Sequence, residues 1–384
     1  MKGIRVVDLT SVLSGPFCTW LLAGMGADVI KVESPDGDTA RQTPPFEEDM
    51  SLYFASLNRN KRSLCLDLKS PSGREALHRL LGTADVFIEN MRPGVRDRLG
   101  CGDEDLKKLN PRLICASISG FGQQGSLSGR PAYDIIVQAM SGMMSINGPQ
   151  GGPATRVGFS VGDISAALFT AIGILERLYR RDSLGEEPKD ALDISMLACQ
   201  WACLENAFSR HLNAGEVPGP IGSRHPSMTP FEPYPTADRQ IVIGLGSVKD
   251  WPRFCDVIGL PALTDDPRFE DDETRLENRD NLDNILGTHF RKHSADHWLS
   301  LMTANDIPCS AIESVKTIAE SPISTEYNAF SSVKSAGGAD MRFVCSPLAP
   351  LSLQETIAPK LGEHTEEILA ELGYSEAERA AFLR

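Results

Sequence analysis

The sequence predicts an α/β protein whose first part forms an open, mostly parallel β-sheet. Over residues 1–120, short runs rich in valine, isoleucine and leucine alternate with amphipathic runs. Strands and helices that alternate in this way build parallel sheets, because each helix returns the chain to the same end of the sheet. A stretch rich in proline and glycine at 215–239 then breaks the rhythm. It predicts a linker into a second domain.

The expected strands are short apolar runs bounded by turn residues, at 3–10, 27–34, 63–68, 84–90 and 112–119. The helices expected between them have apolar residues three and four positions apart, at 16–26, 71–84 and 103–110. Ligands of open parallel sheets bind beyond the carboxyl ends of the strands. We therefore expect the site in the loops at 10–16, 33–38, 90–98 and 119–134.

The clearest helix of the sequence begins at Gly162-Asp163 and ends near Ser183. Five residues give it an apolar face, which we expect to pack on the core: Ile164, Leu168, Ile172, Leu175 and Leu178. A strand at 192–196 and a long helix at 196–212 follow. After the linker, the pattern predicts a strand at 239–246, helices at 251–259, 278–290 and 294–305, an extended segment at 341–354 and two amphipathic helices at the end.

Composition excludes several classes of function. The net charge of −14 argues against nucleic acid or an anionic membrane as a partner, since both favour basic surfaces. No run approaches the roughly 20 apolar residues of a membrane span, and the amino terminus lacks a signal sequence. Nine scattered cysteines without a CxxC pair suggest a reducing, cytoplasmic location and no metal site.

A local basic cluster is compatible with a small anionic ligand, although a solvated basic face is the more ordinary interpretation. Its members fall within eleven residues: Arg59, Lys61, Arg62 and Lys69. Three further arginines lie at positions 92, 96 and 98.

Gly120–Gly125 matches the GxGxxG pattern of dinucleotide-binding proteins, but no helix start follows it. The fingerprint requires its glycines to open a helix that faces the pyrophosphate, so we reject a nicotinamide or flavin site. Among the few histidines, only His225 lies in an ordered-looking loop, where a binding role is possible, and His293 and His297 are expected on a helix surface. No GxSxG elbow is present.

Asp163 has two interpretations. An aspartate at a helix start is a favoured cap, because it accepts unpaired backbone N–H groups and complements the helix dipole. The same position is expected to keep the carboxylate ionised and to point it beyond the edge of the sheet. An ionised carboxylate in a partly dry pocket can act as a nucleophile toward an activated carbonyl.

Seven ordered blocks resemble one known family: VVDLTSVLSGP, GADVIKVESPDGD, NRNKRSLCLDLKSPSG, ENMRPGV, GFGQQG, PAYDIIVQAMSG and VGDISAAL. In this order and spacing they are similar to the class III CoA-transferases of the CaiB/BaiF type, over nearly the whole chain. The resemblance implies a Rossmann-like large domain from residues 1–214 and 326–384. It also implies a smaller α+β domain at 215–325 and an interlocked homodimer.

The resemblance places the family's nucleophilic aspartate on Asp163. It implies no permanently bound cofactor, with coenzyme A entering as an acyl-CoA substrate beside a small carboxylic acid. The coenzyme A contacts it implies are Val12, Leu13, Ser14, Ser34, Leu66, Lys69, Asn90, Met91, Arg92, Arg98, Arg130 and Tyr133. Formyl-CoA transferases have arginine where Ser34 stands and lysine where Pro131 stands, so the phosphate contacts here differ in detail.

The family mechanism passes through an aspartyl anhydride and an aspartyl-CoA thioester, with succinyl-CoA as a possible donor. Gly244 and Gly246 resemble the family's glycine loop over the active site, although a strand-to-helix turn explains them equally well. An α-methylacyl-CoA racemase is the nearest alternative, but its histidine–aspartate pair is replaced by Tyr133-Asp134. Tyrosine, with a pKa of about 10, is a poor base near pH 7. A CoA-binding protein without turnover is the third candidate.

Overall fold

The computed structural model describes residues 1–247, 249–335, 337–349 and 355–382. The chain forms two compact units. The first contains Met1–Met144, Arg156–Val217 and Thr325–Arg384, and the second contains Ser145–Thr155 and Pro218–Ser324.

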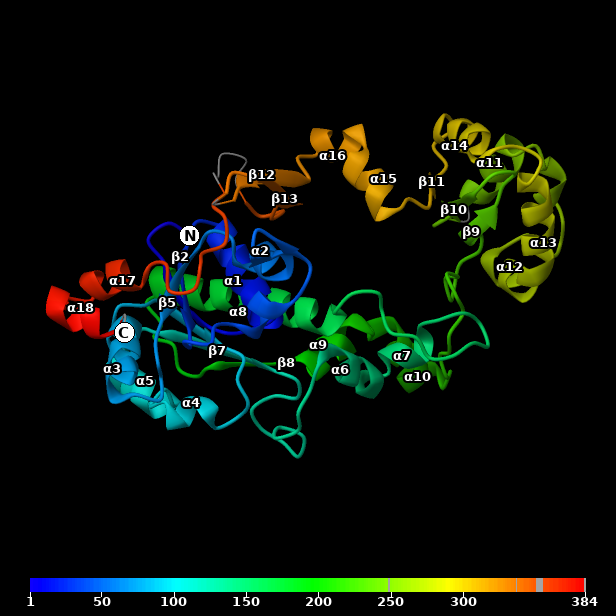
Figure 1. The fold of residues 1–384 in the computed structure, drawn as a ribbon. Coiled ribbons are helices and arrows are strands. Elements are labelled where there is room, and N and C mark those ends of the chain that lie inside the picture. The colour runs from blue at the N-terminus through cyan, green and yellow to red at the C-terminus, as the bar shows by residue number, and fades with distance from the viewer. Residues whose placement is uncertain (248, 336, 350–354, 383–384) are drawn as a thin grey trace. The chain divides into compact units, whose positions relative to one another are not determined.

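A six-stranded sheet forms the centre of the first unit, with strand order β5-β2-β1-β6-β7-β8 (Figure 1). The strands are β1 (Arg5–Leu9), β2 (Asp28–Glu33), β5 (Lys61–Cys65), β6 (Val86–Glu89), β7 (Ile114–Ser119) and β8 (Leu192–Ser195). Every neighbouring pair is parallel. The predicted parallel α/β sheet is therefore confirmed. The strand order reverses between β1 and β6, where such sheets bind ligands.

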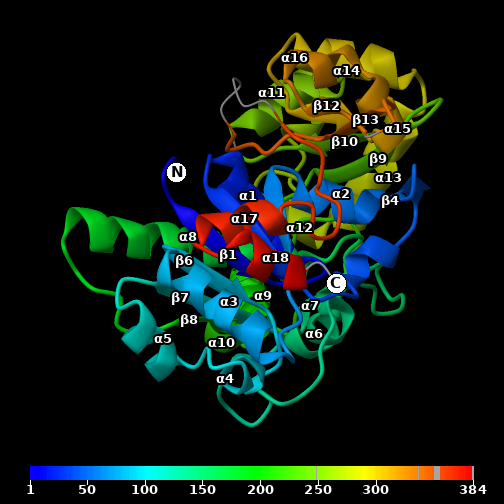
Figure 2. The same ribbon diagram turned by 60° about the vertical axis from the view of Figure 1, so that its left-hand side comes forward.

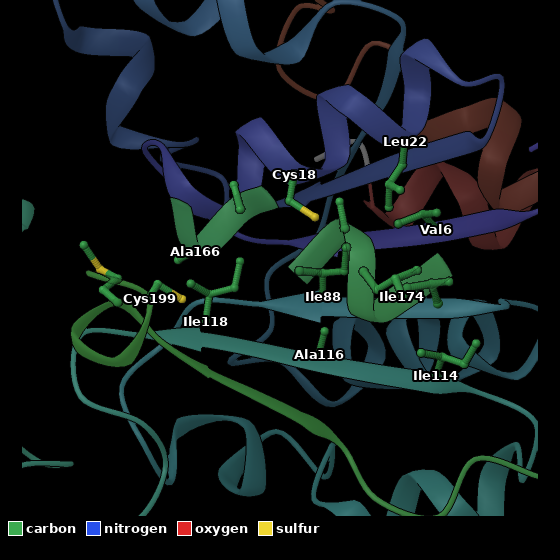
Figure 3. Close-up of a cluster of buried hydrophobic side chains, with 14 of the residues drawn as sticks. Val6, Cys18, Leu22, Ile88, Ile114, Ala116, Ile118, Ala166, Ile174 and Cys199 are labelled. Carbon is green, nitrogen blue, oxygen red and sulfur yellow. The ribbon is translucent and has the colours of Figure 1, made fainter. Parts of the chain in front are cut away.

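Helices cover both faces of this sheet (Figure 2). One face carries α1 (Ser14–Gly24), α8 (Val161–Ser183) and α9 (Met196–Cys203), and the other carries α3 (Pro71–Gly82), α5 (Asp103–Leu109) and α17 (Thr365–Glu371). Figure 3 shows the first core, in which Val6, Ile88 and Ile118 of the sheet meet α1 and α8. Adjacent strand residues point to opposite faces, so each strand contributes apolar side chains to both layers.

The apolar face of α8 is not the one that its sequence predicts. Leu178 is buried with Ala167, Ala171 and Ile174, whereas Ile172 is 63% exposed. Leu168 and Leu175 also face outward, at 43% and 37% exposed. Small residues allow α8 to approach α1 and the sheet closely, and hydropathy alone does not reveal that packing. The prediction was therefore wrong for Leu168, Ile172 and Leu175.

The chain returns to the first unit after the second. The antiparallel hairpin β12 (Phe330–Lys334) and β13 (Asp340–Val344) packs with Phe54 in a small core. The helices α17 and α18 (Glu376–Phe382) match the two predicted terminal helices. Of the predicted extended segment 341–354, residues 350–354 lie outside the described residues.

The second unit has its own core around the antiparallel sheet β11-β10-β9. Its strands are β9 (Phe231–Pro235), β10 (Gln240–Gly244) and β11 (Cys309–Ala311), and its main helices are α11 (Asp250–Val257), α13 (Arg279–Phe290) and α14 (Ala295–Thr303). Strand β9 falls inside 215–239, so that stretch is not a linker throughout. Prolines 230, 233 and 235 hide the strand from sequence prediction, because proline is rare in strands. Strand β9 tolerates them because it lies at the edge of the sheet.

The predicted helix 196–212 is divided at Leu204 into α9 and α10 (Glu205–Ala214). The remaining elements are η1 (Thr39–Gln42), β3 (Phe46–Glu47), β4 (Met50–Ser51), α2 (Leu52–Asn58), α4 (Val95–Arg98), α6 (Asp134–Ser141), α7 (Met143–Ile146), η2 (Pro261–Leu263), α12 (Asp272–Glu277), α15 (Val315–Glu320) and α16 (Pro322–Glu326). Among the described residues, no helix combines the length and the apolar character that crossing a membrane requires.

Candidate active site

A cavity of about 400 Å³ opens in the first unit at the carboxyl ends of β1, β6 and β7. It lies where the strand order reverses, as the open sheet predicts. Loops after these strands supply most of its wall, and the amino ends of α6 and α8 supply the rest. Asp134 and Asp163 thus face the same cavity from two helices.

Asp163 is the third residue of α8, but it does not cap the helix. The backbone N–H and the hydroxyl of Ser14, at the start of α1, both donate hydrogen bonds to its carboxylate. Asp134 takes the capping role instead, because its Oδ1 accepts the backbone N–H of Gly162 at 2.8 Å. Asp163 therefore lies in the first turn of α8, as its ordinary interpretation allows, but its carboxylate does not cap the helix and is directed to the loop after β1.

The pKa of Asp163 is raised to about 7. Burial is the main cause, since it disfavours the charged form, and the negative charge of Asp134 adds to it. The hydrogen bonds from Ser14 oppose this shift without overcoming it. The expectation that the helix start keeps the carboxylate ionised is thus wrong near neutral pH. Burial, with the charge of Asp134 added to it, outweighs the interactions that favour the charged form.

Asp134 is held by a small polar network. Its Oδ2 accepts the amide of Gln138 at 2.6 Å, and the guanidinium of Arg156 lies 3.8 Å from the same oxygen. A side chain at Gly162 would meet the amide nitrogen of Gln200 at 2.2 Å and Asp134 at 3.0 Å. A Cβ before Asp163 would therefore displace the Gln200 amide and crowd Asp134, whereas glycine leaves both side chains in place.

The loop from Thr10 to Ser14 forms the opposite wall of the cavity. The backbone of Val12 is left-handed, with φ 68°, and its N–H donates to both carboxylate oxygens of Asp38 at 3.1 and 3.3 Å. Asn90, after β6, binds the backbone of Ser11 in both directions: its Oδ1 accepts the N–H at 2.9 Å and its Nδ2 donates to the carbonyl at 2.8 Å.

A buried charge cluster, formed by Asp8, Lys31, Asp38 and Lys61, lies beneath this loop. Lys61 is 3.0 Å from Asp8, and Lys31 is 2.9 Å from Asp38. Burial opposes ionisation of Asp8, but Lys61, Lys31 and two threonine hydroxyls hold its pKa well below the usual range. Asp8 therefore stays charged and pairs with Lys61, while Lys31 pairs with Asp38.

This cluster corrects the interpretation of two of the basic residues. Lys61 and Arg59 are neither solvated nor available to a ligand. The side chain of Lys61 is fully buried, and Arg59 is buried against Glu355. Arg62 pairs with Asp28 and Glu371 at 2.8 and 2.7 Å. Only Lys69 of the four is exposed.

The cavity brings most of the predicted coenzyme A residues together with Asp163. Its lining includes Val12, Leu13, Ser14, Asn90, Met91, Arg92, Arg130 and Tyr133. Ser34, Lys69 and Arg98 are exposed outside it, and Leu66 is buried in the core. Gly244 ends β10 and Gly246 follows it, both in the second unit.

Three residues near Asp163 were not predicted as site residues. Asp38 and Asp134 lie in loops where the sequence predicts the site, at 33–38 and 119–134, but neither is among the predicted site residues. Tyr53, on α2, is the third: burial and the nearby charges of Asp163 and Asp38 raise its pKa to about 12. Residues 52–58 were not predicted as a helix, so no pattern placed Tyr53 near the cavity.

The rejected motifs have structural explanations. No helix starts after Gly120–Gly125 until Asp134, and a side chain at Gly120 would collide with Ala132 at 2.3 Å. His225, in the second unit, packs on Phe231, with ring centroids 5.1 Å apart. Throughout the described parts of the chain, no group of three or more histidine, cysteine, aspartate or glutamate side chains is arranged to hold a metal.

Comparison with known proteins identifies the family. The model of CoA-transferase family III matches residues 1–365. The chain belongs to CoA-transferase family III. It is 40% identical to the acetyl-CoA:oxalate CoA-transferase of Acetobacter aceti, over 98% of this chain and 96% of that protein. Mouse succinyl-CoA:glutarate CoA-transferase is 37% identical, over 83% and 73% of the two chains.

A crystal structure supports the same assignment. The CaiB/BaiF family protein from Brucella suis superposes with a TM-score of 0.83 and 31% identity, over 97% of this chain and 98% of that one. The predicted family is confirmed, and the chain is an enzyme of the CoA-transferase class. Coenzyme A thioesters are the substrates that this class implies.

The raised pKa of Asp163 predicts a pH-dependent stability. Its pKa is about 7 in the folded chain and near 3.8 when unfolded, so ionisation destabilises the fold progressively from about pH 4 to pH 7. At pH 8 we expect the free energy of unfolding of Asp163→Asn, measured by urea denaturation, to exceed that of the wild type by roughly 2–4 kcal/mol. This difference should become smaller toward pH 4. Asp190 is exposed, so Asp190→Asn should have the same free energy of unfolding as the wild type at both pH values. Equal stability of Asp163→Asn and wild type at pH 8 would contradict the raised pKa.

Proposed function

We propose that this CoA-transferase moves coenzyme A from an acyl-CoA to a free carboxylic acid through covalent intermediates on Asp163. The observation that carries the proposal is the placement of Asp163, the buried carboxylate that faces the cavity and accepts two hydrogen bonds from Ser14. Once ionised, a carboxylate with a raised pKa is a stronger nucleophile than an ordinary one, because it holds its electron pair less tightly.

The proposed reaction has four steps. The Asp163 carboxylate attacks the thioester carbonyl, and the C–S bond breaks to give an aspartyl–acyl anhydride and coenzyme A thiolate. The thiolate attacks the aspartyl carbonyl, releasing the donor carboxylate and forming an aspartyl-CoA thioester. The acceptor carboxylate attacks this thioester and expels the thiolate, and a second anhydride forms. The thiolate then attacks the acceptor's acyl carbon and releases Asp163 as a carboxylate.

Ser14 is suited to stabilise these intermediates. Each step places negative charge on an oxygen bound to the carbonyl carbon of Asp163 or of the acyl group. The backbone N–H and hydroxyl of Ser14 already point at the Asp163 oxygens, so they need no reorganisation as charge develops. Every intermediate is prone to hydrolysis, and we propose that the loop at Gly244 and Gly246 helps exclude water.

For coenzyme A itself, we propose that the eight predicted residues lining the cavity make the contacts near the thioester. Arg92 and Arg130 are exposed, and their guanidinium groups suit the negative phosphates of the ligand. By family resemblance, Ser34, Leu66, Lys69 and Arg98 complete the site.

We also propose a cytoplasmic location, which the nine unpaired cysteines support.

A hydroxylamine experiment tests the covalent mechanism. Wild-type protein incubated with acyl-CoA and hydroxylamine should acquire a hydroxamate on Asp163, seen by peptide mass spectrometry. Asp163→Ala should acquire none and should lose several orders of magnitude in CoA exchange. Asp190→Asn is the control. Full exchange by Asp163→Ala would refute the mechanism, and deuterium uptake at the acyl α-carbon without exchange would favour the racemase instead.

As the acceptor, we propose a small dicarboxylic acid. The relatives above are named for oxalate and glutarate, which are both dicarboxylic acids. Arg156 supports the same class: its side chain is 43% exposed, and its nearest acidic partner among the described residues is Asp134, at 3.8 Å. A half-exposed guanidinium at that distance can still bind the second carboxylate of an acceptor.

An acid panel tests this acceptor class. With one acyl-CoA donor, thioester formation should favour short dicarboxylic acids over monocarboxylic acids of equal length. Arg156→Gln should raise the KM of the dicarboxylic acids about tenfold and leave that of the monocarboxylic acids nearly unchanged, because only the second carboxylate loses a partner. Lys189→Gln, far along the sheet edge, is a matched loss of charge. Equal effects on both acid classes would refute the role of Arg156.

We propose that two copies of the chain form an interlocked homodimer. The outer face of α8 supports this, because it presents an unbroken apolar stripe: Leu168, Ile172, Leu175 and Tyr179. These residues are three and four positions apart, so they line one side of the helix. Large exposed apolar patches of this kind mark protein interfaces.

Sedimentation tests the dimer. Wild-type protein should sediment at twice its chain mass of 41.8 kDa. Ile172→Arg should yield monomer or aggregate, since it puts a charge into the stripe, whereas Leu109→Arg on exposed α5 should sediment as the wild type does. A wild-type monomer at tens of micromolar would refute the proposal.

A further inference from the structure

We infer that Asp38, paired with Lys31, is a positioning residue that holds the loop from Thr10 to Ser14 in the shape that presents Ser14 to Asp163. Asp38 does not line the cavity. It acts through the backbone of Val12, two residues before Ser14. The inference rests on the proposed function in one respect: it assigns a catalytic consequence to the shape of this loop.

Asp38 is built to receive several donors. Its carboxylate accepts the N–H of Val12 at 3.1 and 3.3 Å and the N–H of Ala40 at 2.9 Å. The ammonium of Lys31 lies 2.9 Å from Oδ2 and also donates to the carbonyl of Thr10 at 2.9 Å. The two side chains are 1% and 0% exposed, so water does not compete for these bonds. The pair therefore grips the loop at two points, Thr10 and Val12.

The loop needs that grip because Val12 is held in an unfavourable conformation. Its φ of 68° lies in the left-handed region, which a β-branched residue rarely adopts. Val12 is 36% exposed, so packing around it is incomplete. The hydrogen bonds to Asp38 are the interactions that compensate for it. Without them, we expect Val12 to relax to an ordinary extended backbone.

Relaxation at Val12 would displace the residues that follow. Leu13 and Ser14 line the cavity, and Ser14 begins α1 while donating its N–H and hydroxyl to Asp163. Asn90 holds Ser11 on the other side of Val12, so the change would be directed toward Ser14 rather than spread along the chain. A charge pair beneath the loop thus fixes the donors that face the reacting carboxylate.

The test compares two aspartate variants, one at the amino end of β2 and one in the loop that follows β2. Asp38→Asn leaves a single acceptor oxygen for three donors, whereas Asp28→Asn removes a charge paired with Arg5 and Arg62 at the amino end of β2. At saturating acyl-CoA, Asp38→Asn should form the Asp163 hydroxamate at least tenfold more slowly than wild type. Asp28→Asn should remain within twofold. Asp38→Asn that retains the wild-type rate at saturation would overturn the inference.

A rescue distinguishes positioning from general destabilisation. Glycine adopts left-handed backbone readily, so Val12→Gly added to Asp38→Asn should recover the rate severalfold. A merely structural loss would not respond to that change. Failure of the rescue, in a double variant that unfolds at the same urea concentration as Asp38→Asn, would overturn the inference.

Asp38→Asn leaves the buried ammonium of Lys31 without its paired carboxylate, so a second variant controls for a loss of folding. Lys31→Met with Asp38→Asn removes both charges together and leaves neither uncompensated, and the same slow rate and rescue are expected of it. A crystal structure of either variant with Val12 unchanged would overturn the inference alone. A wild-type protein that forms no hydroxamate would instead refute the proposed function, while the crystal structure would still decide whether Asp38 sets the loop.

Discussion

The pairing of buried charges beneath the loop after β1 is the interaction on which the active-site geometry depends. Asp8 and Lys61 join β1 to β5 across the sheet, and Lys31 and Asp38 join β2 to the loop. Such pairs are costly to bury, and a hydrophobic core of equal volume is often as stable. What the charge pairs provide is a fixed conformation. The backbone that faces the cavity must adopt the shape in which these charges remain paired.

The second constraint is the meeting of two carboxylates, Asp134 and Asp163, at the amino end of α8. Asp134 occupies the capping position and takes the backbone N–H that would otherwise stabilise a neighbouring charge. Asp163 is consequently left between a negative neighbour and the two donors of Ser14. Burial and repulsion make the carboxylate basic, and the donors keep it oriented. The absence of a side chain at Gly162 is what allows this arrangement to be so compact.

Local sequence patterns predicted most of the sheet and the position of the site at its edge. Valine and isoleucine runs identified β1, β2, β6 and β7, and the rule for parallel sheets then placed the cavity at their carboxyl ends. What escaped prediction depends on long-range contacts. Asp38 reaches Val12 across 26 positions, and Asp134 reaches Gly162 across 28. The exposed stripe of α8 escaped for the opposite reason, because apolar periodicity does not tell whether the covering partner is the same chain.

The return of the chain end to the first sheet has a consequence for synthesis. Ile368 and Leu369 of α17 are fully buried against the layer that β5 and α3 begin, and Glu371 pairs with Arg5 at the very start of the chain. A ribosome exposes β1 long before it exposes α17. The first unit therefore waits, with the part of its sheet beneath α17 uncovered, while the second unit is made. A nascent chain of this enzyme is at its most vulnerable to aggregation during that interval. The interval ends when the last helices of the chain are made and pack on the sheet.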